Sequence, residues 1–267
     1  MSQYKHGTDG ILGNSIITNA TKAGTCAVYV GIAPVNLIQG YKEAGIINNP
    51  VQLNNISAKT VIGYSKNWSD FTLCEVLDAH FNSPLGNIGP IYVVNVLNPD
   101  VHRKAEQTTK SLTFTNGSVS IKSDTIILDT IVIADKVKGE DFKISYNFET
   151  GITKIESISK TEPLTGTVTI SYYEIDLTLI DETEIIGKEE DGVYEGLHAI
   201  SLLYQDKNVI PNLIAIPKWS EIKEVYEAVI NYCEKINGHW YAYVYADIPI
   251  LDGITKIDTI TKAKDWA

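Results

Sequence analysis

Two short motifs in the second half of the chain pair residue types that support chemistry in other proteins. Glu195 and His198 form an E-x-x-H motif, which is half of the ligand set of a carboxylate-bridged di-metal site. Such a site needs a second E-x-x-H and two more glutamates, and the sequence holds no second motif. Ser220 and Lys223 satisfy S-x-x-K, but neither S-D-N nor K-T-G accompanies them. We therefore predict no metal at Glu195 and His198, and we interpret Ser220 as a helix N-cap.

Acidic residues and tyrosines cluster in two further segments. Between positions 174 and 195, nine acidic residues stand against the single Lys188, but their spacing is not that of an EF-hand loop. We interpret this segment as a solvated acidic connector rather than a calcium site. Tyr241, Tyr243 and Tyr245 alternate along one predicted strand and share a face, which could stack sugars or line an interface. Because strands favour aromatic residues for packing alone, we predict that this row packs against helices.

Other motifs of catalytic or cofactor sites are missing from the sequence. It contains no G-x-G-x-x-G, Walker, H-E-x-x-H or G-x-S-x-G pattern, and its five histidines have no spacing that suggests a site. We predict that the protein is not an enzyme, with no catalytic or metal-ligating residue and no cofactor.

Charge and cysteine content limit the partners and compartments that suit the chain. Its 267 residues carry a formal net charge of −11 with Arg103 as the only arginine, so we expect no nucleic-acid partner. Cys26, Cys74 and Cys233 are too few and too scattered for a disulfide framework or a C-x-x-C metal pair. The opening residues have no apolar h-region, and no apolar run approaches the ~18 residues of a membrane span. We expect no signal peptide, no membrane contact and synthesis in a reducing cytoplasm.

Hydrophobic periodicity divides the chain into three parts. In the first, apolar runs at 25–33 and 91–97 predict buried strands, and a helix is expected over 69–82 with Ser69 as N-cap. From about 100 to 184 the helical period vanishes, and five or six short β-branched runs predict a small sandwich or barrel. Asn116-Gly117 is its sharpest hairpin signal.

The third part returns to alternating helices and strands. We expect a helix with Val193, Leu197, Ile200 and Tyr204 on one face, and a strand at 213–216. A helix capped by Ser220 and stopped at 237–238, a strand at 240–248 and a last helix from about 253 complete the pattern.

The predicted fold class is therefore α+β or α/β, with a mixed α/β core domain interrupted by an inserted all-β sandwich or small barrel. The predicted boundaries are 1–98 for the first half of the core, 99–185 for the insert and 186–267 for the second half of the core.

Short sequence motifs, here called words, resemble those of contractile phage tail sheath proteins and occur in the same order over nearly the whole chain. They are YKHG at 4–7, VGIAPVN at 30–36, GYS at 63–65 with LCE at 73–75, VVNVLNP at 93–99, DFKISY at 141–146, VTISYY at 168–173, IIG at 185–187, GLHA at 196–199, IPNLIAIPKWS at 210–220 and ADIP at 246–249. Two positions depart from the family pattern, because Asn212 and Lys218 stand where glycines are usual. We expect this to change turn geometry but not the fold.

The resemblance implies a structural subunit. Sheath subunits stack as hexameric rings around a tail tube protein, and contraction drives that tube through a target envelope without a cofactor. The implied location is the virion tail of a bacteriophage or prophage, or a phage-tail-like particle. Terminal arms in this family add strands to neighbouring copies, so the resemblance makes Tyr4, Lys5, His6 and Gly7 a candidate subunit-interface arm.

Family members continue well past the ADIP word, which leads us to expect that this sequence is a truncated piece. A piece without its C-terminal arm would be a monomer at micromolar concentration. Two other functions stay open at this point. One is a binding module whose β-sandwich recognises a surface carbohydrate or protein, with a free aromatic row as its mark. The other is a hydrolase-type enzyme on the α/β core, although no nucleophile–base pair is recognisable.

Overall fold

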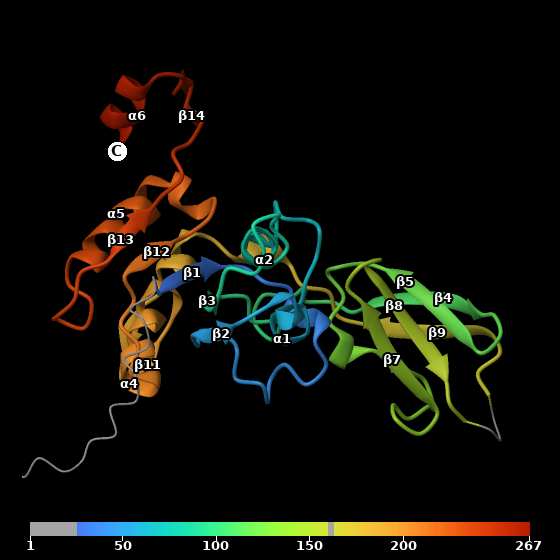
Figure 1. The fold of residues 1–267 in the computed structure, drawn as a ribbon. Coiled ribbons are helices and arrows are strands. Elements are labelled where there is room, and N and C mark those ends of the chain that lie inside the picture. The colour runs from blue at the N-terminus through green and yellow to red at the C-terminus, as the bar shows by residue number, and fades with distance from the viewer. Residues whose placement is uncertain (1–25, 160–162) are drawn as a thin grey trace, which may run out of the picture.

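The computed structural model describes residues 26–159 and 163–267, which form a helix-covered mixed sheet and a lobe of antiparallel strands (Figure 1). The predicted mixed α/β fold class is confirmed, with several sheets and six α-helices in the described part of the chain. The candidate arm of Tyr4, Lys5, His6 and Gly7 lies outside the described residues.

A five-stranded sheet forms the centre of the core. Its spatial order is β13-β12-β1-β3-β2, and only β2 runs antiparallel to its neighbour. The strand bounds are Ala27–Gly31 for β1, Val51–Leu53 for β2, Ile91–Asn95 for β3, Leu213–Ala215 for β12 and Tyr243–Tyr245 for β13. All of β3 is buried, as expected for a strand covered on both faces. The apolar runs therefore predicted the three central strands.

The predicted strand over 240–248 is wrong in extent, because β13 has three residues. Before it, Ile236 and Trp240 close a turn and Ala242 N–H donates to the carbonyl of Cys233, at the end of the preceding helix. After it, Asp247 N–H donates to Ser220 Oγ at 2.8 Å and leads the chain away from the sheet.

Helices cover the two faces of this sheet unevenly. Their bounds are Lys59–Ile62 for α1, Thr72–Phe81 for α2, Glu182–Ile186 for α3, Leu202–Lys207 for α4, Lys223–Glu234 for α5 and Ile260–Trp266 for α6. Helix α2 packs on β1 from one side, while α5 packs on β13 and the 3₁₀-helix Gly196–Ser201 packs on β1 and β3. None of the described helices reaches the length and hydrophobicity that a membrane span requires.

Both predicted serine caps are wrong. Helix α2 begins at Thr72 without a side-chain cap, and Ser69 Oγ instead donates to Asn67 Oδ1. Helix α5 begins at Lys223, also without one, and the Ser220 hydroxyl accepts the Asp247 bond. In each case the hydroxyl forms a hydrogen bond with a loop residue, and helical periodicity carries no information about that bond.

Two other predicted helices are interrupted by hairpins. Strands β10 (Glu189–Glu190) and β11 (Val193–Tyr194) place Val193 in a hairpin, and the chain becomes helical only at Gly196. Near the C-terminus, β14 (Leu251–Asp252) and β15 (Thr255–Lys256) form a hairpin where a helix was expected from about 253.

The β lobe consists of two three-stranded antiparallel sheets, in the orders β4-β9-β6 and β5-β8-β7. Its strands are Thr108–Phe114 (β4), Ser118–Lys122 (β5), Val132–Ile133 (β6), Phe142–Asn147 (β7), Ile152–Ser157 (β8) and Gly166–Tyr172 (β9). Both sheets contribute to one apolar cluster that includes Phe114, Phe142, Ile155 and Ile170. The cluster gives the lobe a core of its own.

The Asn116-Gly117 turn forms, but it does not make the expected hairpin ladder. Both residues have positive φ, and Thr115 and Ser118 exchange backbone hydrogen bonds across the turn. Beyond this pair β4 continues in one sheet with β9, while β5 continues in the other sheet with β8. The turn therefore connects the two sheets of the lobe.

Asn36 fastens the β lobe to the core. Its side chain is fully buried, and Nδ2 donates to the carbonyls of Asp124 and Ile126 at 2.9 Å each. The adjacent Leu37 inserts into the lobe's apolar cluster. Without this amide, each of the two lobe carbonyls would lose the donor that Asn36 supplies.

We expect Asn36→Ala to lower the free energy of unfolding by roughly 1–3 kcal/mol, because the buried carbonyl of Ile126 and the partly buried carbonyl of Asp124 would lose their donor. Urea denaturation followed by circular dichroism measures the change. The matched control is Asn87→Ala, which removes one exposed amide bond to the carbonyl of Asn54 and should change stability by less than about 0.5 kcal/mol. Equal losses in both variants would contradict the anchoring role of Asn36.

The domain boundaries predict that residues 99–185 fold alone as a β domain. All described members of the lobe's cluster except Leu37 lie inside this segment, so most of its core travels with it. Amide NMR shifts of the expressed segment should be dispersed as in a folded β protein. Random-coil shifts would refute these boundaries.

Candidate functional site

The outer edge of β13 is open. This strand pairs only with β12 among the described strands, and Tyr243 N–H donates to the carbonyl of Asn212 at 3.0 Å. Backbone groups alternate in direction along a strand, so the N–H and C=O of Val244 point away from β12. An open edge of this kind can accept another strand.

One face of β13 is also uncovered. The strand register aligns Tyr245 with Ala215 and Tyr29, so these three residues face the same side as α2. Helix α2 covers that face at β1, where the Tyr29 hydroxyl lies 2.7 Å from His80 Nε2. Tyr243 and Tyr245 lie beyond it and are 79% and 67% exposed.

The prediction that the tyrosine row packs against helices is therefore wrong. Helix α5 packs on the opposite face, where the half-buried Val244 contacts the core. Tyr241, before the strand, is 78% exposed.

Exposed apolar residues continue beyond β13. We define the edge surface as Tyr241, Tyr243, Tyr245, Ile248 and Ile250, all of which are exposed. The chain after Ile250 projects from the sheet and ends in α6 (Figure 1). It is tied back to α5 through Lys223 Nζ, which donates to the carbonyl of Trp266, and through the ring contact of Tyr226 with Trp266.

The carboxyl end of the sheet carries a second candidate site. Here β1 lies between β3 on one side and β12 on the other, so the strand order reverses at β1. Open α/β sheets bind ligands at such a topological switch point. A cavity of about 320 Å³ lies here, lined by His80, Lys218, Glu221 and Asp247 among others.

Most of the polar groups of this cavity already have partners. Lys218 has a φ of +66°, in the left-handed region that favours glycine. Its N–H donates to Asp247 Oδ2 at 2.7 Å. His80 Nδ1 lies 2.8 Å from the carbonyl of Ile88, which can only accept, so Nδ1 is the donor of this bond, and Nε2 lies 2.7 Å from the Tyr29 hydroxyl. This histidine is positioned as a structural link.

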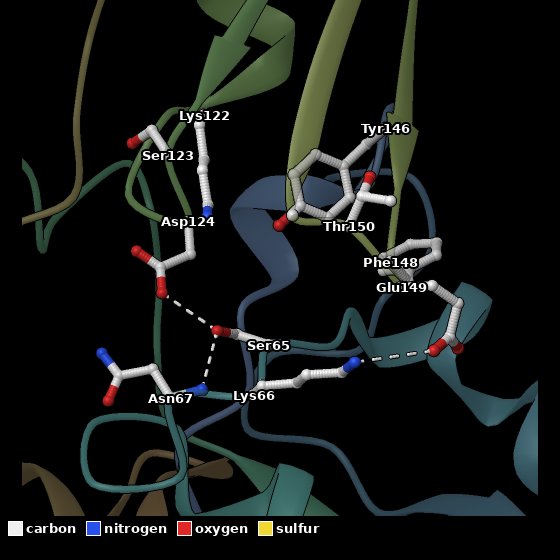
Figure 2. Close-up of a pocket in the computed structure, with 11 residues that line it drawn as sticks. Ser65, Lys66, Asn67, Lys122, Ser123, Asp124, Tyr146, Phe148, Glu149 and Thr150 are labelled. Carbon is white, nitrogen blue, oxygen red and sulfur yellow. Dashed lines mark hydrogen bonds and ion pairs between the residues drawn. The ribbon is translucent and has the colours of Figure 1, made fainter.

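A third cavity lies between the core and the β lobe, and residues of both line it (Figure 2). It has a volume of about 580 Å³. Ser65 Oγ donates to Asp124 Oδ2 at 2.9 Å, and Glu149 pairs with Lys59 at 3.0 Å and with Lys66 at 4.0 Å. Burial raises the pKa of Tyr146, on the lobe side, to about 12. Because these contacts run between lobe and core, the cavity belongs to their junction.

The sequence motifs with catalytic potential do not assemble into a site. His198 packs its ring edge-on against Tyr232 at 5.6 Å, and no group of three or more His, Cys, Asp and Glu side chains in residues 26–159 and 163–267 is arranged to hold a metal. In the acidic segment, Asp181 and Glu184 form the capping box of α3, and Glu174 pairs with Lys104 at 2.8 Å.

The three thiols are unpaired and poorly reactive. Cys74 and Cys233 are buried and Cys26 is half-buried. Burial raises the pKa to about 12 for the first two and to about 11 for Cys26. Since the thiolate is the nucleophile, these groups are unreactive near neutral pH.

We expect protein purified without added metal to contain no stoichiometric iron, manganese or zinc. The single E-x-x-H is half of a ligand set, and the His198 ring is engaged with Tyr232. Mass spectrometry of acid-digested protein measures metal content, with His198→Ala as the control. Stoichiometric metal that disappears in this variant would reverse the interpretation.

Comparison of the chain with family models, with curated proteins and with solved structures finds no match.

Proposed function

We propose that this chain is a structural subunit of a contractile tail sheath, located in a virion tail or a phage-tail-like particle. The observation that carries the proposal is the edge surface, an open strand edge bordered by exposed aromatic and aliphatic side chains. Subunits of a self-assembling lattice need such edges, because an added strand satisfies outward backbone groups and covers apolar area at once.

The order of the sequence words supports the same proposal. Several of them coincide with elements that shape the core: the word at 30–36 contains the lobe anchor Asn36, and the word at 210–220 contains β12. The word at 246–249 includes Asp247, which fixes the turn at Lys218. In the proposed function the partners are copies of the chain in hexameric rings and the tail tube protein, and the protein is not an enzyme.

The position of the aromatic row favours the binding-module alternative less than the sheath function. An exposed row is the mark of such a module, and Tyr241, Tyr243 and Tyr245 are exposed. The row lies on the core sheet and not on the β lobe, which was the proposed recognition domain. A carbohydrate- or protein-binding lobe would need a separate surface.

The hydrolase alternative needs a histidine beside a serine or cysteine. His80 contacts Tyr29, and His198 contacts Tyr232. His102 Nδ1 accepts from the backbone N–H of Asn98, and His239 meets the Trp240 ring. None of these geometries activates a nucleophile.

Val244→Pro tests the proposal at the strand edge. Proline removes the outward N–H of Val244 while leaving the bond from Tyr243 to Asn212, and edge strands tolerate proline at outward positions. The variant and the control Val244→Ala are made in the full-length protein. Negative-stain microscopy and analytical ultracentrifugation measure assembly.

We expect tubes or rings from the wild type and from Val244→Ala, and monomers from Val244→Pro with its circular dichroism unchanged. Tubes from Val244→Pro would show that this edge is not used, and absence of any assembly by the wild type would contradict the sheath function.

A further inference from the structure

An aromatic pocket lies on the core, next to the hairpin of β10 and β11. It has a volume of about 660 Å³, within the ~300–1,000 Å³ range of small-molecule sites. Its walls come from the 3₁₀-helix and α4, from α5, and from the turn that precedes β13. Separate segments thus converge on one concave site.

Aromatic rings supply much of the lining. Tyr204 and Trp240 contact each other with ring centroids 4.3 Å apart at an angle of 51°. Tyr204 is 41% exposed and Trp240 is half-buried, so both rings keep accessible surface. Tyr232 is held from behind, because its hydroxyl lies 2.8 Å from Ser201 Oγ and its ring meets His198.

Polar groups without a protein partner accompany these rings. In the described part of the chain, no hydrogen bond or ion pair involves the side chains of Glu189, Lys235 or His239, or the indole N–H of Trp240, although the His239 ring meets Trp240 edge-on at 5.6 Å. The amides of Gln205 and Asn237 each use one donor, toward Tyr194 Oη and the carbonyl of Ser201. Their carbonyl oxygens remain free to accept.

Two other cavities differ from the aromatic pocket, because several of their polar side chains are engaged in hydrogen bonds or ion pairs. In the cavity between core and lobe, Lys66, Glu149, Ser65 and Asp124 are engaged with one another. In the cavity at the sheet's carboxyl end, His80 and Asp247 are likewise engaged. The aromatic pocket joins the partly exposed rings of Tyr204 and Trp240 to several hydrogen-bonding groups that have no protein partner.

We propose that the aromatic pocket binds a neutral oligosaccharide. A sugar ring presents an apolar C–H face that packs on aromatic rings, and its hydroxyls both donate and accept hydrogen bonds. Trp240 and Tyr204 provide the packing surface, and Gln205, Asn237 and Glu189 provide acceptors. Lys235 and Glu189 balance each other in charge, which favours a neutral ligand over an anionic one. The inference is independent of the proposed sheath function.

Saturation-transfer NMR tests this site with a fixed panel of maltotriose, cellotriose, mannotriose and tri-N-acetylchitotriose. The protein is the whole chain, as wild type and as Trp240→Ala. Trp68→Ala is the matched control, because Trp68 is also partly exposed but lies outside the pocket. Tyr204→Ala, at a more exposed ring, provides a second variant if Trp240→Ala does not fold.

We expect at least one sugar to receive saturation at its ring protons, with affinity reduced about tenfold or more by Trp240→Ala or Tyr204→Ala. Trp68→Ala should bind that sugar as the wild type does. The proposal fails if no panel member receives saturation at millimolar concentration. It also fails if the pocket variants bind as tightly as the wild type, or if Trp68→Ala loses binding to the same degree.

Discussion

The fold depends on one pairing constraint at the centre of the core. Strand β1 hydrogen-bonds on one side to β3, which precedes the β lobe in sequence, and on the other side to β12, which follows it. The chain must therefore leave and re-enter the core at nearby points. It does so through a neck in which Lys104 N–H donates to the carbonyl of Glu174, and Asp176 N–H donates to that of His102. The only arginine, Arg103, stacks over the Tyr173 ring at 4.3 Å in this neck.

The sequence predicted those elements whose signal is local. The buried runs at 25–33, 91–97 and 213–216 became β1, β3 and β12, because a strand covered on both faces must be apolar at nearly every position. The Asn116-Gly117 turn was also readable, since both residues favour positive φ. The pairing partners of the strands on either side of that turn come from distant segments of the chain. The turn therefore predicted one hairpin of β4 and β5, although the two strands belong to different sheets.

The candidate sites were less predictable from the sequence, because they depend on whether another element covers a strand or helix. Alternating tyrosines at 241, 243 and 245 look the same whether or not a helix covers them, and only the register with β12 and the position of α2 show that they are bare. The Ser69 and Ser220 hydroxyls followed the pattern of helix caps but serve loop contacts instead. The aromatic pocket was also missed, since Tyr204 and Trp240 are separated by all of β12 and α5.

The short length of β13 decides which force would dominate a contact at the edge surface. Three residues offer few outward backbone groups, and each hydrogen bond contributes only ~0.5–1.5 kcal/mol net. Tyr243 and Tyr245 can each cover much of their exposed area, and at about 25 cal/mol per Å² this amounts to a few kcal/mol per ring. Apolar burial therefore outweighs strand pairing in strength, while pairing sets the register. The net charge of −11 opposes contact between copies, and salt screens that repulsion over about 8 Å at physiological ionic strength. An edge of this composition thus associates more readily as salt rises, because screening weakens the repulsion and leaves the apolar attraction in place.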